Sequence, residues 1–329
     1  MIKNFWADLP KPFFAVAPLA NVTDAAFRRL IAKYSKGPGA APYITYTEFV
    51  SADGLALAPE EGRQKLLRDL VFSEAERPIL AQFFTATPAH MEKAAALAQE
   101  LGFDGVDINM GCPDRAIERQ GAGAELIKTP ELAAELVAAA KRGAPNLPVS
   151  VKTRLGYNQD TLEDWLPKIL AAKPVALALH ARTRKEMSKV DAHWDRVKRA
   201  VEIRNALGSD TLIVGNGDVK SVAHARELVA QTGCDGVMIG RGIFGSPWLF
   251  SAQTQRSIEE RLRICIEHTK LFEELLGDLK SFAIMKKHFK AYIEGFDGAK
   301  ELRTRLMEAK DAADVERMIL EFSSTLQKI

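Results

Sequence analysis

The chain has few cysteines and no long apolar run, and each absence narrows its class. Its 329 residues include three cysteines, Cys112, Cys234 and Cys265, without CxxC or Cys/His metal spacing. A disulfide framework and a zinc site are therefore not indicated. No segment offers the roughly 18 consecutive apolar residues that a membrane helix needs, and no apolar run of secretory length opens the sequence. We expect a cytoplasmic protein with no membrane partner and no metal.

An excess of one charge is also lacking. Lys and Arg number 45 and Asp and Glu number 43, and this balance neither supports nor excludes a nucleic-acid partner, because phosphate binding depends on local clustering. No repeat with a period of about 20 to 50 residues is present, which excludes a solenoid. Nothing fixes an oligomeric state, and a monomer is assumed. The 47% hydrophobic content is enough to bury a sizeable core.

Short apolar runs rich in Val, Ile, Leu and Phe alternate with longer segments of helical periodicity. This alternation predicts parallel strands joined through βαβ crossovers. We count eight runs: FFAVA ending near Ala17, PYITYTEF around Glu48, PILAQFF around Gln82, DGVDINM ending at Asn109, PVSVKTR around Lys152, VALALH ending at His180, TLIVGN ending at Asn216 and DGVMIGR ending at Arg241.

The predicted helices have clear start and stop signals. Thr87-Pro88 opens a helix that Gly102 closes, and Ser221 starts one that ends at Gly233. Eight such units over about 250 residues predict a closed (β/α)8 barrel, whereas an open doubly wound sheet more often has a G-x-G-x-x-G after its first strand, which is absent. We predict an α/β protein with a barrel domain at 1–255 and a small helical bundle domain at 256–329.

A polar residue stands at the carboxyl end of strand after strand. In barrels that rim carries the active site. A single strand-end polar residue is usually a cap or turn residue, but seven together favour a functional rim: Glu48, Gln82, Asn109, Lys152, His180, Asn216 and Arg241.

Motifs in the barrel resemble the dihydrouridine synthase family in both content and order. The element Asn109-Met110-Gly111-Cys112-Pro113 is similar to the family's Asn-x-Gly-Cys-Pro, and MKKHFKAYIEG at 285–295 is more weakly similar to its C-terminal helical domain. The other matching motifs are APLANVTDAAFR at 17–28, AQFF at 81–84, GAGAELIKTP at 121–130, VSVKTRLGYN at 149–158, ALHARTR at 178–184, VGNGDV at 214–219 and GVMIGRGIFGSPWLF at 236–250.

The resemblance implies an FMN enzyme that reduces the C5=C6 bond of uridines in tRNA. Hydride from reduced FMN goes to C6, a proton from Cys112 goes to C5, and NADPH re-reduces the flavin. An unperturbed thiol, with a pKa of ~8.5, is mostly protonated at neutral pH and can donate. By the same resemblance, Asn109 binds the uracil edge of a uridine extruded from its stack. Cys234 and Cys265 are predicted to be small buried hydrophobes.

FMN needs a platform, a cation and a phosphate cradle. We expect Ala17, Pro18 and Leu19 to lie under the ring system, Gln82 to bond its pyrimidine edge and Lys152 to stabilise the reduced form. A Schiff-base role for Lys152 is an alternative, because barrels also host aldolases. The loops after the last two strands commonly hold phosphate. The predicted cradle residues are Asn216, Gly217, Asp218, Gly240 and Arg241, with His180 near the ribityl chain or phosphate.

Two groups of basic residues are candidate tRNA contacts. Arg182 and Arg184 are expected to meet phosphates beside the target uridine. Lys286, Lys287 and Lys290 are spaced to share one helical face. Two interpretations of this face are kept: an ordinary solvated surface, and a groove that binds the tRNA backbone. Two other functions remain: an FMN barrel acting on a free pyrimidine, as in dihydroorotate dehydrogenase, and an RNA-binding chaperone without catalysis.

Overall fold

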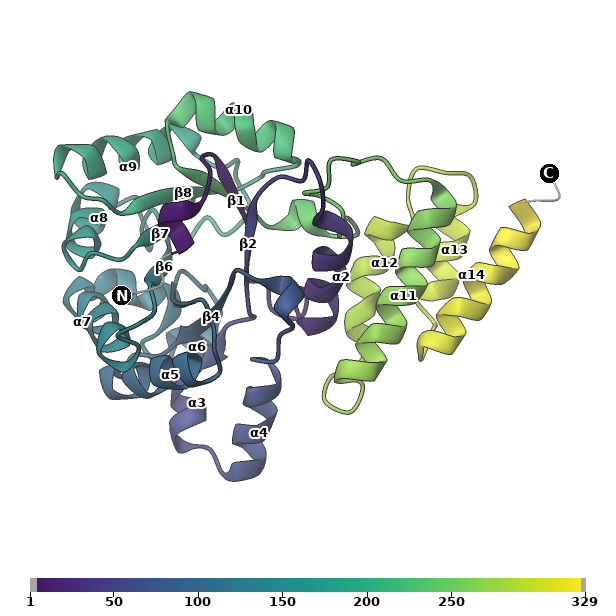
Figure 1. The fold of residues 1–329 in the computed structure, drawn as a ribbon, viewed down its shortest axis with the longest axis horizontal. Coiled ribbons are helices and arrows are strands. Elements are labelled where there is room, and N and C mark those ends of the chain that lie inside the picture. The colour runs from purple at the N-terminus through teal and green to yellow at the C-terminus, as the bar shows by residue number, and fades with distance from the viewer. Residues whose placement is uncertain (1–4, 327–329) are drawn as a thin grey trace. The chain divides into compact units, whose positions relative to one another are not determined.

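The apolar runs of the sequence form one parallel sheet that closes on itself. Its strands are β1 (Phe13–Val16), β2 (Tyr43–Tyr46), β3 (Val50–Ser51), β4 (Ile79–Phe84), β5 (Gly105–Met110), β6 (Val149–Arg154), β7 (Ala176–His180), β8 (Leu212–Asn216) and β9 (Gly236–Ile239). In this computed structural model, which describes residues 5–326, neighbours follow the order β2-β1-β9-β8-β7-β6-β5-β4-β3. An additional β2–β4 pairing closes the ring (Figure 1), and the predicted eight-stranded barrel is confirmed, with the short β3 as an addition.

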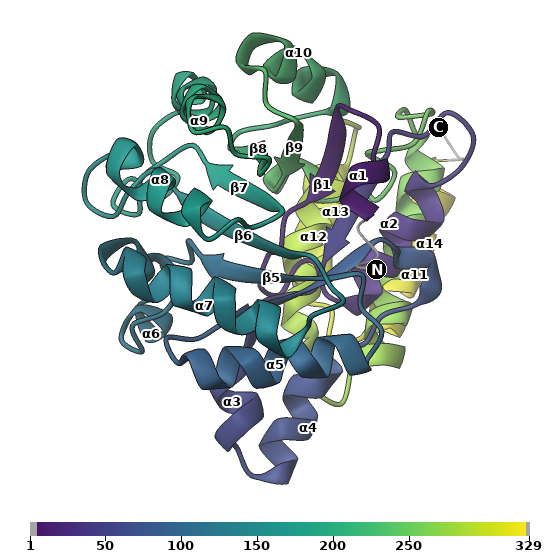
Figure 2. The ribbon, with the colours of Figure 1, turned by 60° about the vertical axis from the view of Figure 1, so that its left-hand side comes forward.

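Helices cover the outside of the strands, as Figure 2 shows, and they begin and end where the sequence signals predicted. Ser221 caps α10 by accepting a hydrogen bond from the His224 backbone, and Gly233 ends that helix in the left-handed region. The outer helices are α3 (Ala52–Leu57), α4 (Glu60–Arg68), α5 (Pro88–Glu100), α6 (Arg115–Glu118), α7 (Pro130–Gly143), α8 (Leu162–Ala171), α9 (Trp194–Ala206) and α10 (Val222–Thr232).

Alternate strand residues fill the barrel interior. Aromatic side chains from Trp6 of α1 (Phe5–Asp8) and from Phe13 pack at the end where the strands begin. Small side chains at Ala15, Ala17 and Ala178 take the inner positions on β1, just after it and on β7.

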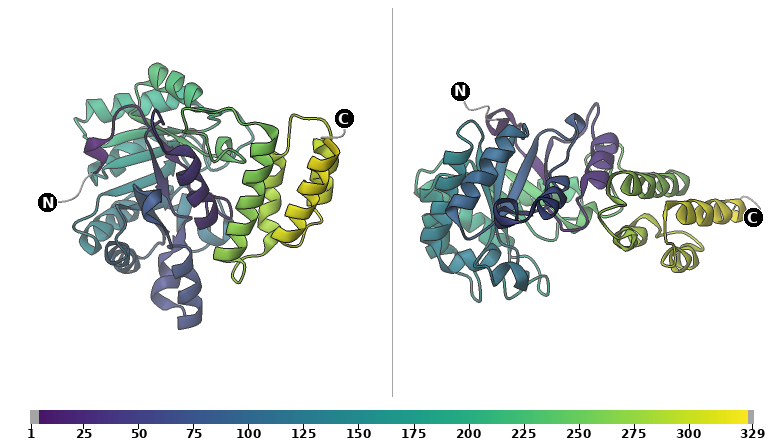
Figure 3. Two further views of the ribbon diagram at one scale, coloured as in Figure 1. Left: turned by 45° about the vertical axis from the view of Figure 1, so that its right-hand side comes forward. Right: turned by 90° about the horizontal axis from the view of Figure 1, so that it is seen from below.

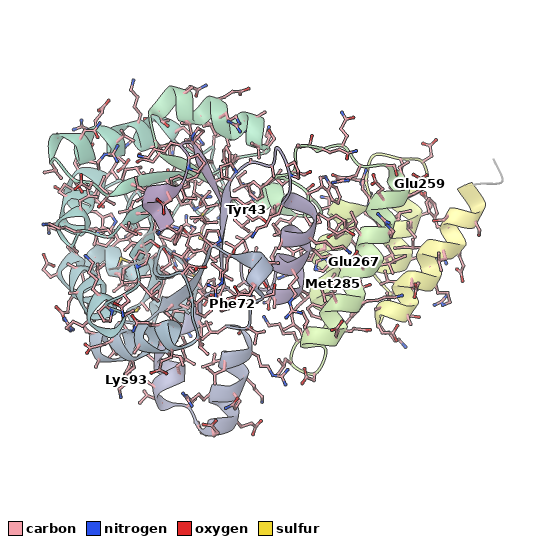
Figure 4. All side chains as sticks on the ribbon, in the orientation of Figure 1. Tyr43, Phe72, Lys93, Glu259, Glu267 and Met285 are labelled. Carbon is pink, nitrogen blue, oxygen red and sulfur yellow. The ribbon has the colours of Figure 1, made fainter. Side chains whose placement is uncertain are left out.

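A second unit consists of helices around their own apolar core. Its helices are α2 (Ala25–Ser35), α11 (Ile258–Leu276), α12 (Lys286–Tyr292), α13 (Ala299–Leu306) and α14 (Ala312–Leu326), of which α11–α14 lie side by side in Figure 3. Met285, labelled in Figure 4, is fully buried in this core. Glu267 of α11 accepts hydrogen bonds from the Lys33 ammonium and the Tyr34 hydroxyl of α2.

Each of the two units consists of three separate segments of the chain. The barrel unit comprises Met1–Leu19, Pro42–Val71 and Arg77–Gly242, and the helical unit comprises Ala20–Ala41, Phe72–Glu76 and Ile243–Ile329. The sequence predicted a single boundary after residue 255. α2 groups with the helices because its Phe27 ring packs against His268 of α11 and His288 of α12. Residues 1–4 and 327–329, at the outer ends of the predicted domains, lie outside the described residues.

Neither a membrane span nor a metal cluster occurs in the described part of the chain. None of the helices between residues 5 and 326 is long and apolar enough to cross a membrane. No cluster of three or more His, Cys, Asp or Glu side chains in that range could hold a metal ion.

Candidate active site

The carboxyl ends of four consecutive strands bring four predicted rim residues together. Asn109 of β5 is in register with Lys152 of β6, and His180 of β7 is in register with Asn216 of β8. Because the strands are parallel, these ends open at one edge of the barrel, which we call the mouth. Four of the seven residues that the sequence placed on a shared rim therefore lie at one edge of the barrel, and their functional roles stay predictions.

The loop after β5 holds Cys112 at the mouth. Asn109 Oδ1 accepts hydrogen bonds from the backbone N–H groups of Gly111 (3.1 Å) and Cys112 (2.8 Å). The Cys112 carbonyl accepts from the Ala124 backbone at 2.9 Å. Gly123, at φ +64°, lies so close that a Cβ there would stand 2.7 Å from the Cys112 carbonyl oxygen. The loop thus fixes the cysteine backbone from both sides.

The Cys112 thiol is half-buried beside apolar side chains of Phe84, Ile117 and Ala122. Burial raises the pKa of the thiol, and this outweighs the nearby positive charges of Lys152 and Arg154, which lower it. The thiol is accordingly protonated at neutral pH and can serve as a proton donor. Cys234 and Cys265 are buried elsewhere, as predicted.

A buried polar network, formed by Gln82, Asn109, Asp107 and Ser150, lies beneath this loop. Gln82 Nε2 donates to Asp107 Oδ2 at 2.6 Å, and Gln82 Oε1 accepts from Asn109 Nδ2 at 3.0 Å. Ser150 Oγ donates to the other oxygen of Asp107. The flavin contact predicted for Gln82 stays a prediction, since the contacts described for its amide are to Asp107 and Asn109.

Sequence reasoning missed Asp107 and Ser150. Burial raises the pKa of the Asp107 carboxyl to about 6, against the hydrogen bonds from Ser150 and Gln82 that lower it. A signal was available, since Asp107 and Asn109 are two residues apart in one strand and so share a face. Ser150 gave no such signal, because only the strand register brings it beside Asp107.

Lys152 extends into the mouth as a cation without a bonded counter-ion. Burial, and after it the charge of Arg154, lowers the pKa of the Lys152 ammonium to about 8. No hydrogen bond or ion pair engages its Nζ within the part of the chain that the structure describes. Arg154 instead ties two loops together by donating to the carbonyls of Gly111 (2.7 Å) and Thr183 (3.2 Å).

His180 belongs to a row of hydrogen bonds along the mouth. Its Nε2 lies 3.2 Å from Arg182 Nη1, and a guanidinium can only donate. His180 is therefore neutral, with its proton on Nδ1. Burial, reinforced by Arg154 and Lys152, holds the pKa of His180 well below its usual range. Arg182 also bonds Asp218, whose other oxygen accepts from Arg241 Nη2 at 2.6 Å.

The loops after β8 and β9 contain the predicted phosphate cradle. Gly217 has φ +136°, and a Cβ there would come within 2.7 Å of the Ala192 Cβ. Across residues 5–326, no acceptor is found for the backbone N–H groups of Gly217 and Gly240. Asn216 Nδ2 donates to the Met238 carbonyl at 2.8 Å, and Arg241 is exposed. Unused donors and a cation therefore occur together in these two loops.

The predicted tRNA contacts differ in how they are placed. Arg182 is buried, with its donors given to His180, Asp218 and the Val190 carbonyl. Arg184 is partly exposed and pairs with Glu118. The phosphate contacts proposed for both arginines stay predictions, and their observed contacts order the rim.

The three lysines of α12 lie in the helical unit. Lys287 and Lys290 are exposed and Lys286 is half-buried. None of the three forms an ion pair with another described residue. A 3-10 turn at Phe282–Met285, capped by Ser281, precedes α12.

Comparisons with known proteins agree over almost the whole chain. The model of the dihydrouridine synthase family matches residues 15–328. A Staphylococcus aureus protein named probable tRNA-dihydrouridine synthase is 37% identical over 331 residues, covering 100% of this chain and 98% of its own. A Bacillus subtilis protein named probable tRNA-dihydrouridine synthase 2 is 39% identical, covering 98% of this chain and 97% of its own.

Solved structures agree on the fold. Histamine dehydrogenase from Rhizobium sp. 4-9 has a TM-score of 0.52 at 14% identity, covering 78% of this chain and 48% of that one. A 2-naphthoyl-CoA reductase has the same TM-score at 12% identity, covering 72% of this chain and 49% of that one. Since the family match spans the barrel mouth as well as the helical unit, the chain belongs to the dihydrouridine synthase family.

Proposed function

We propose that the protein reduces the C5=C6 bond of selected uridines in tRNA. The observation that carries the proposal is the Cys112 thiol, which is protonated and held at the mouth beside the cation of Lys152. The names of the Staphylococcus and Bacillus relatives support tRNA as the substrate. The oxidoreductase activity follows from the family.

The residues of the mouth fit FMN. Ala17, Pro18 and Leu19 would lie under its ring system, where the interior side chains are small, with Gln82 at its pyrimidine edge. When bound, reduced FMN supplies the hydride that adds to C6 of the uracil. Lys152 would stabilise negative charge on the reduced ring system, since its ammonium has no counter-ion of its own among the described residues.

The phosphate of FMN fits the loops after β8 and β9. The unused N–H groups of Gly217 and Gly240 are the donors that a phosphate requires, and the exposed Arg241 adds a charged partner. Asn216 and Asp218 would hold the loops in place by their bonds to Met238 and to the two arginines. The neutral His180 would donate from Nδ1 to the ribityl chain or phosphate.

The chain's own part in the reaction is proton transfer and orientation. Cys112 donates the proton on Sγ to C5 of the uracil as C6 gains the hydride, so the thiol becomes a thiolate and takes a new proton from solvent. The positive charges of Lys152 and Arg154 favour that thiolate. Asn109 Nδ2 carries two hydrogens and uses one within the described residues, which leaves the other for the uracil edge.

We further propose NADPH as the reductant and the helical unit as a tRNA-binding domain. The exposed Lys287 and Lys290, with Lys286 beside them, present positive charge without a paired carboxylate among the described residues, as a surface for a phosphate backbone requires. Arg184 would meet phosphates near the target uridine after exchanging its bond to Glu118.

The test is the formation of dihydrouridine by purified protein. FMN-loaded protein, NADPH and an unmodified tRNA transcript are incubated, and digested nucleosides are analysed by mass spectrometry. Dihydrouridine in the transcript, and none when the substrate is free uracil or uridine, is the expected result. Reduction of the free base without reduction of tRNA would instead identify a pyrimidine enzyme. Binding of tRNA without turnover by flavin-loaded protein would identify an RNA-binding protein.

A further inference from the structure

The buried polar network runs from the barrel interior to the backbone of Cys112. Ser150 donates to Asp107, Gln82 donates to Asp107, Asn109 donates to Gln82, and the N–H groups of Gly111 and Cys112 donate to Asn109. Every link in this series is a single hydrogen bond between named groups. The series therefore connects a carboxylate deep in the barrel to the cysteine at the mouth.

The strand register places the members of the network side by side. Gln82 of β4 is in register with Asp107 of β5, and Asp107 is in register with Ser150 of β6. All four side chains are buried, with exposed fractions of 0% for Gln82, 1% for Asp107 and Ser150, and 5% for Asn109. Solvent cannot replace a missing partner at such positions, so each bond depends on the next.

The chemistry of the groups gives the series one direction. A carboxylate only accepts hydrogen bonds, so the Gln82 amide must turn its Nε2 toward Asp107 and its Oε1 toward Asn109. Asn109 must then present Nδ2 to Gln82, which leaves Oδ1 for the backbone N–H groups of Gly111 and Cys112. The loop N–H groups only donate and so require the same direction, and the acceptor-only carboxylate at the far end holds both amides in that one orientation.

Charge supports the same arrangement. Lys152 favours the ionised form of Asp107, and at neutral pH a carboxyl with a pKa of about 6 is mostly ionised. Tyr46 is the other titratable group packed against Asp107, and its pKa lies well above its usual range because it is buried. The Tyr46 phenol stays neutral, so Asp107 is the anion among Asp107, Lys152 and Tyr46.

We propose that Asp107 is a positioning residue that sets the orientation of the Gln82 and Asn109 amides and, through them, the conformation of the Cys112 loop. Asp107 does not touch the substrate. The inference rests on the proposed role of Cys112 as proton donor, and it adds the group that keeps this donor in place.

The experiment compares Asp107→Leu, Asp107→Asn and Ser150→Ala in FMN-loaded protein. Leucine removes the acceptor at similar volume. Asparagine keeps the shape but has one acceptor oxygen in place of two, so it cannot accept from both Gln82 Nε2 and Ser150 Oγ. Alanine at position 150 leaves the carboxylate and its bond to Gln82 but removes its second hydrogen bond, and is the graded variant.

Two measurements are made on each variant, and all variants are made in a protein that carries Cys234→Ala. The first is the rate at which iodoacetamide alkylates Cys112. The second is kcat and KM on tRNA. We expect about a hundredfold lower kcat for Asp107→Leu, with KM little changed, because a displacement near 1 Å costs about that much. Alkylation should be faster as the loop loosens, by about fivefold in Asp107→Asn, where one oriented hydrogen bond is removed. Ser150→Ala should lie between the wild type and Asp107→Asn in both measurements, because it removes one of the two hydrogen bonds that hold the Asp107 carboxylate.

The outcomes separate this inference from the proposed function. Wild-type alkylation and kcat in both Asp107 variants would overturn the positioning role while dihydrouridine formation stands. If the wild type forms no dihydrouridine, the proposed function fails, and alkylation rates still decide whether Asp107 controls the loop. If Asp107→Leu does not fold, the isosteric Asp107→Asn decides, and an unchanged alkylation rate in that variant would refute the proposal.

Discussion

The barrel interior and the core of the helical unit both bury titratable side chains, but they treat them differently. In the barrel, Asp107 is hydrogen-bonded and linked to a loop that carries chemistry. In the helical unit, His268 and His288 lie in edge-to-face contact with ring centroids 4.6 Å apart. Within the described residues, His268 Nε2 and both ring nitrogens of His288 have no hydrogen-bond partner. Connected polar groups determine an orientation, whereas isolated ones add a cost to folding.

The largest expected effect is at the end of the connected network. Cys112→Ala should keep FMN bound and lower the rate of dihydrouridine formation by ~10²- to 10⁴-fold, because it removes a general acid and leaves the hydride source. Single-turnover mixing of reduced protein with tRNA measures the rate. Cys234→Ala, a buried cysteine outside the mouth, is the control and should retain the wild-type rate. An unchanged rate in Cys112→Ala would remove the thiol from the mechanism.

His288, whose ring nitrogens have no hydrogen-bond partner among the described residues, should make the helical unit sensitive to acid. Burial lowers the pKa of His288 to about 3, below an ordinary value near 6.5. The unfolded chain therefore takes up the proton first, so stability is full above about pH 6.5 and is lost as pH falls toward 3, by up to ~5 kcal/mol. Urea unfolding followed by fluorescence measures this in a protein in which Trp248 is the one tryptophan kept and the other three are replaced by phenylalanine.

The matched variants are His288→Leu and His193→Leu. Leucine at 288 removes a titrating group from the core, so its free energy of unfolding should fall less than that of the wild type between pH 7 and pH 4. His193 lies partly buried in the barrel unit beside Glu186, and its variant shows the effect of removing a histidine outside the helical core. Equal acid sensitivity in all three proteins would show that the isolated pair is not costly.

Asp107, the carboxylate of the hydrogen-bonded network, should make the free energy of unfolding depend on pH in the opposite direction and by a smaller amount. The pKa of Asp107 is raised to about 6 in the fold, above an ordinary Asp value near 3.9. The fold therefore favours the protonated form, and stability is lost as pH rises from about 4 to 6, by ~3 kcal/mol. Asp107→Asn should be more stable than the wild type above pH 6 and equal to it near pH 4, by urea unfolding.

Asp235→Asn provides the contrast for that measurement. Burial would raise the pKa of Asp235, but the bonds from Lys11 and the Ile213 backbone hold it below its usual range. Its removal should therefore lower stability at neutral pH. A stabilised Asp235→Asn, or a destabilised Asp107→Asn, would contradict the difference between the two carboxylates.

The smallest effect is expected on the outer surface of the helical unit. Alanine at Lys286, Lys287 and Lys290 should weaken tRNA binding across all sequences, and should reduce the slope of log K against log salt by about one for each phosphate that the protein no longer neutralises. Filter binding over a salt series measures the slope. Lys168→Ala, at a lysine already paired with Glu131, should leave the slope unchanged. An unchanged slope in the triple variant would place tRNA elsewhere.

Residues in regular strands and at helix caps could be predicted from sequence, and residues whose role depends on register could not. The eight runs became strands because apolar side chains recur locally, and Ser221 and Gly233 act within one helix end. Asp107 and Ser150 acquire their roles only when β5 and β6 align, 43 residues apart in sequence. Arg182 was expected to meet phosphates, and its burial with a bond to the Val190 carbonyl could not be predicted, because the path of that loop leaves no local signal in the sequence.

The left-handed Gly123 beneath the Cys112 carbonyl also constrains the family's sequence variation. Any L-amino acid at that position would be strained at φ +64° and would press its first carbon against the cysteine backbone. A mutation there would spare the barrel while displacing Cys112, the proposed proton donor. We therefore expect homologues that retain the cysteine of Cys112 to retain the glycine of Gly123 as well. Homologues without this cysteine should tolerate other residues at the glycine position.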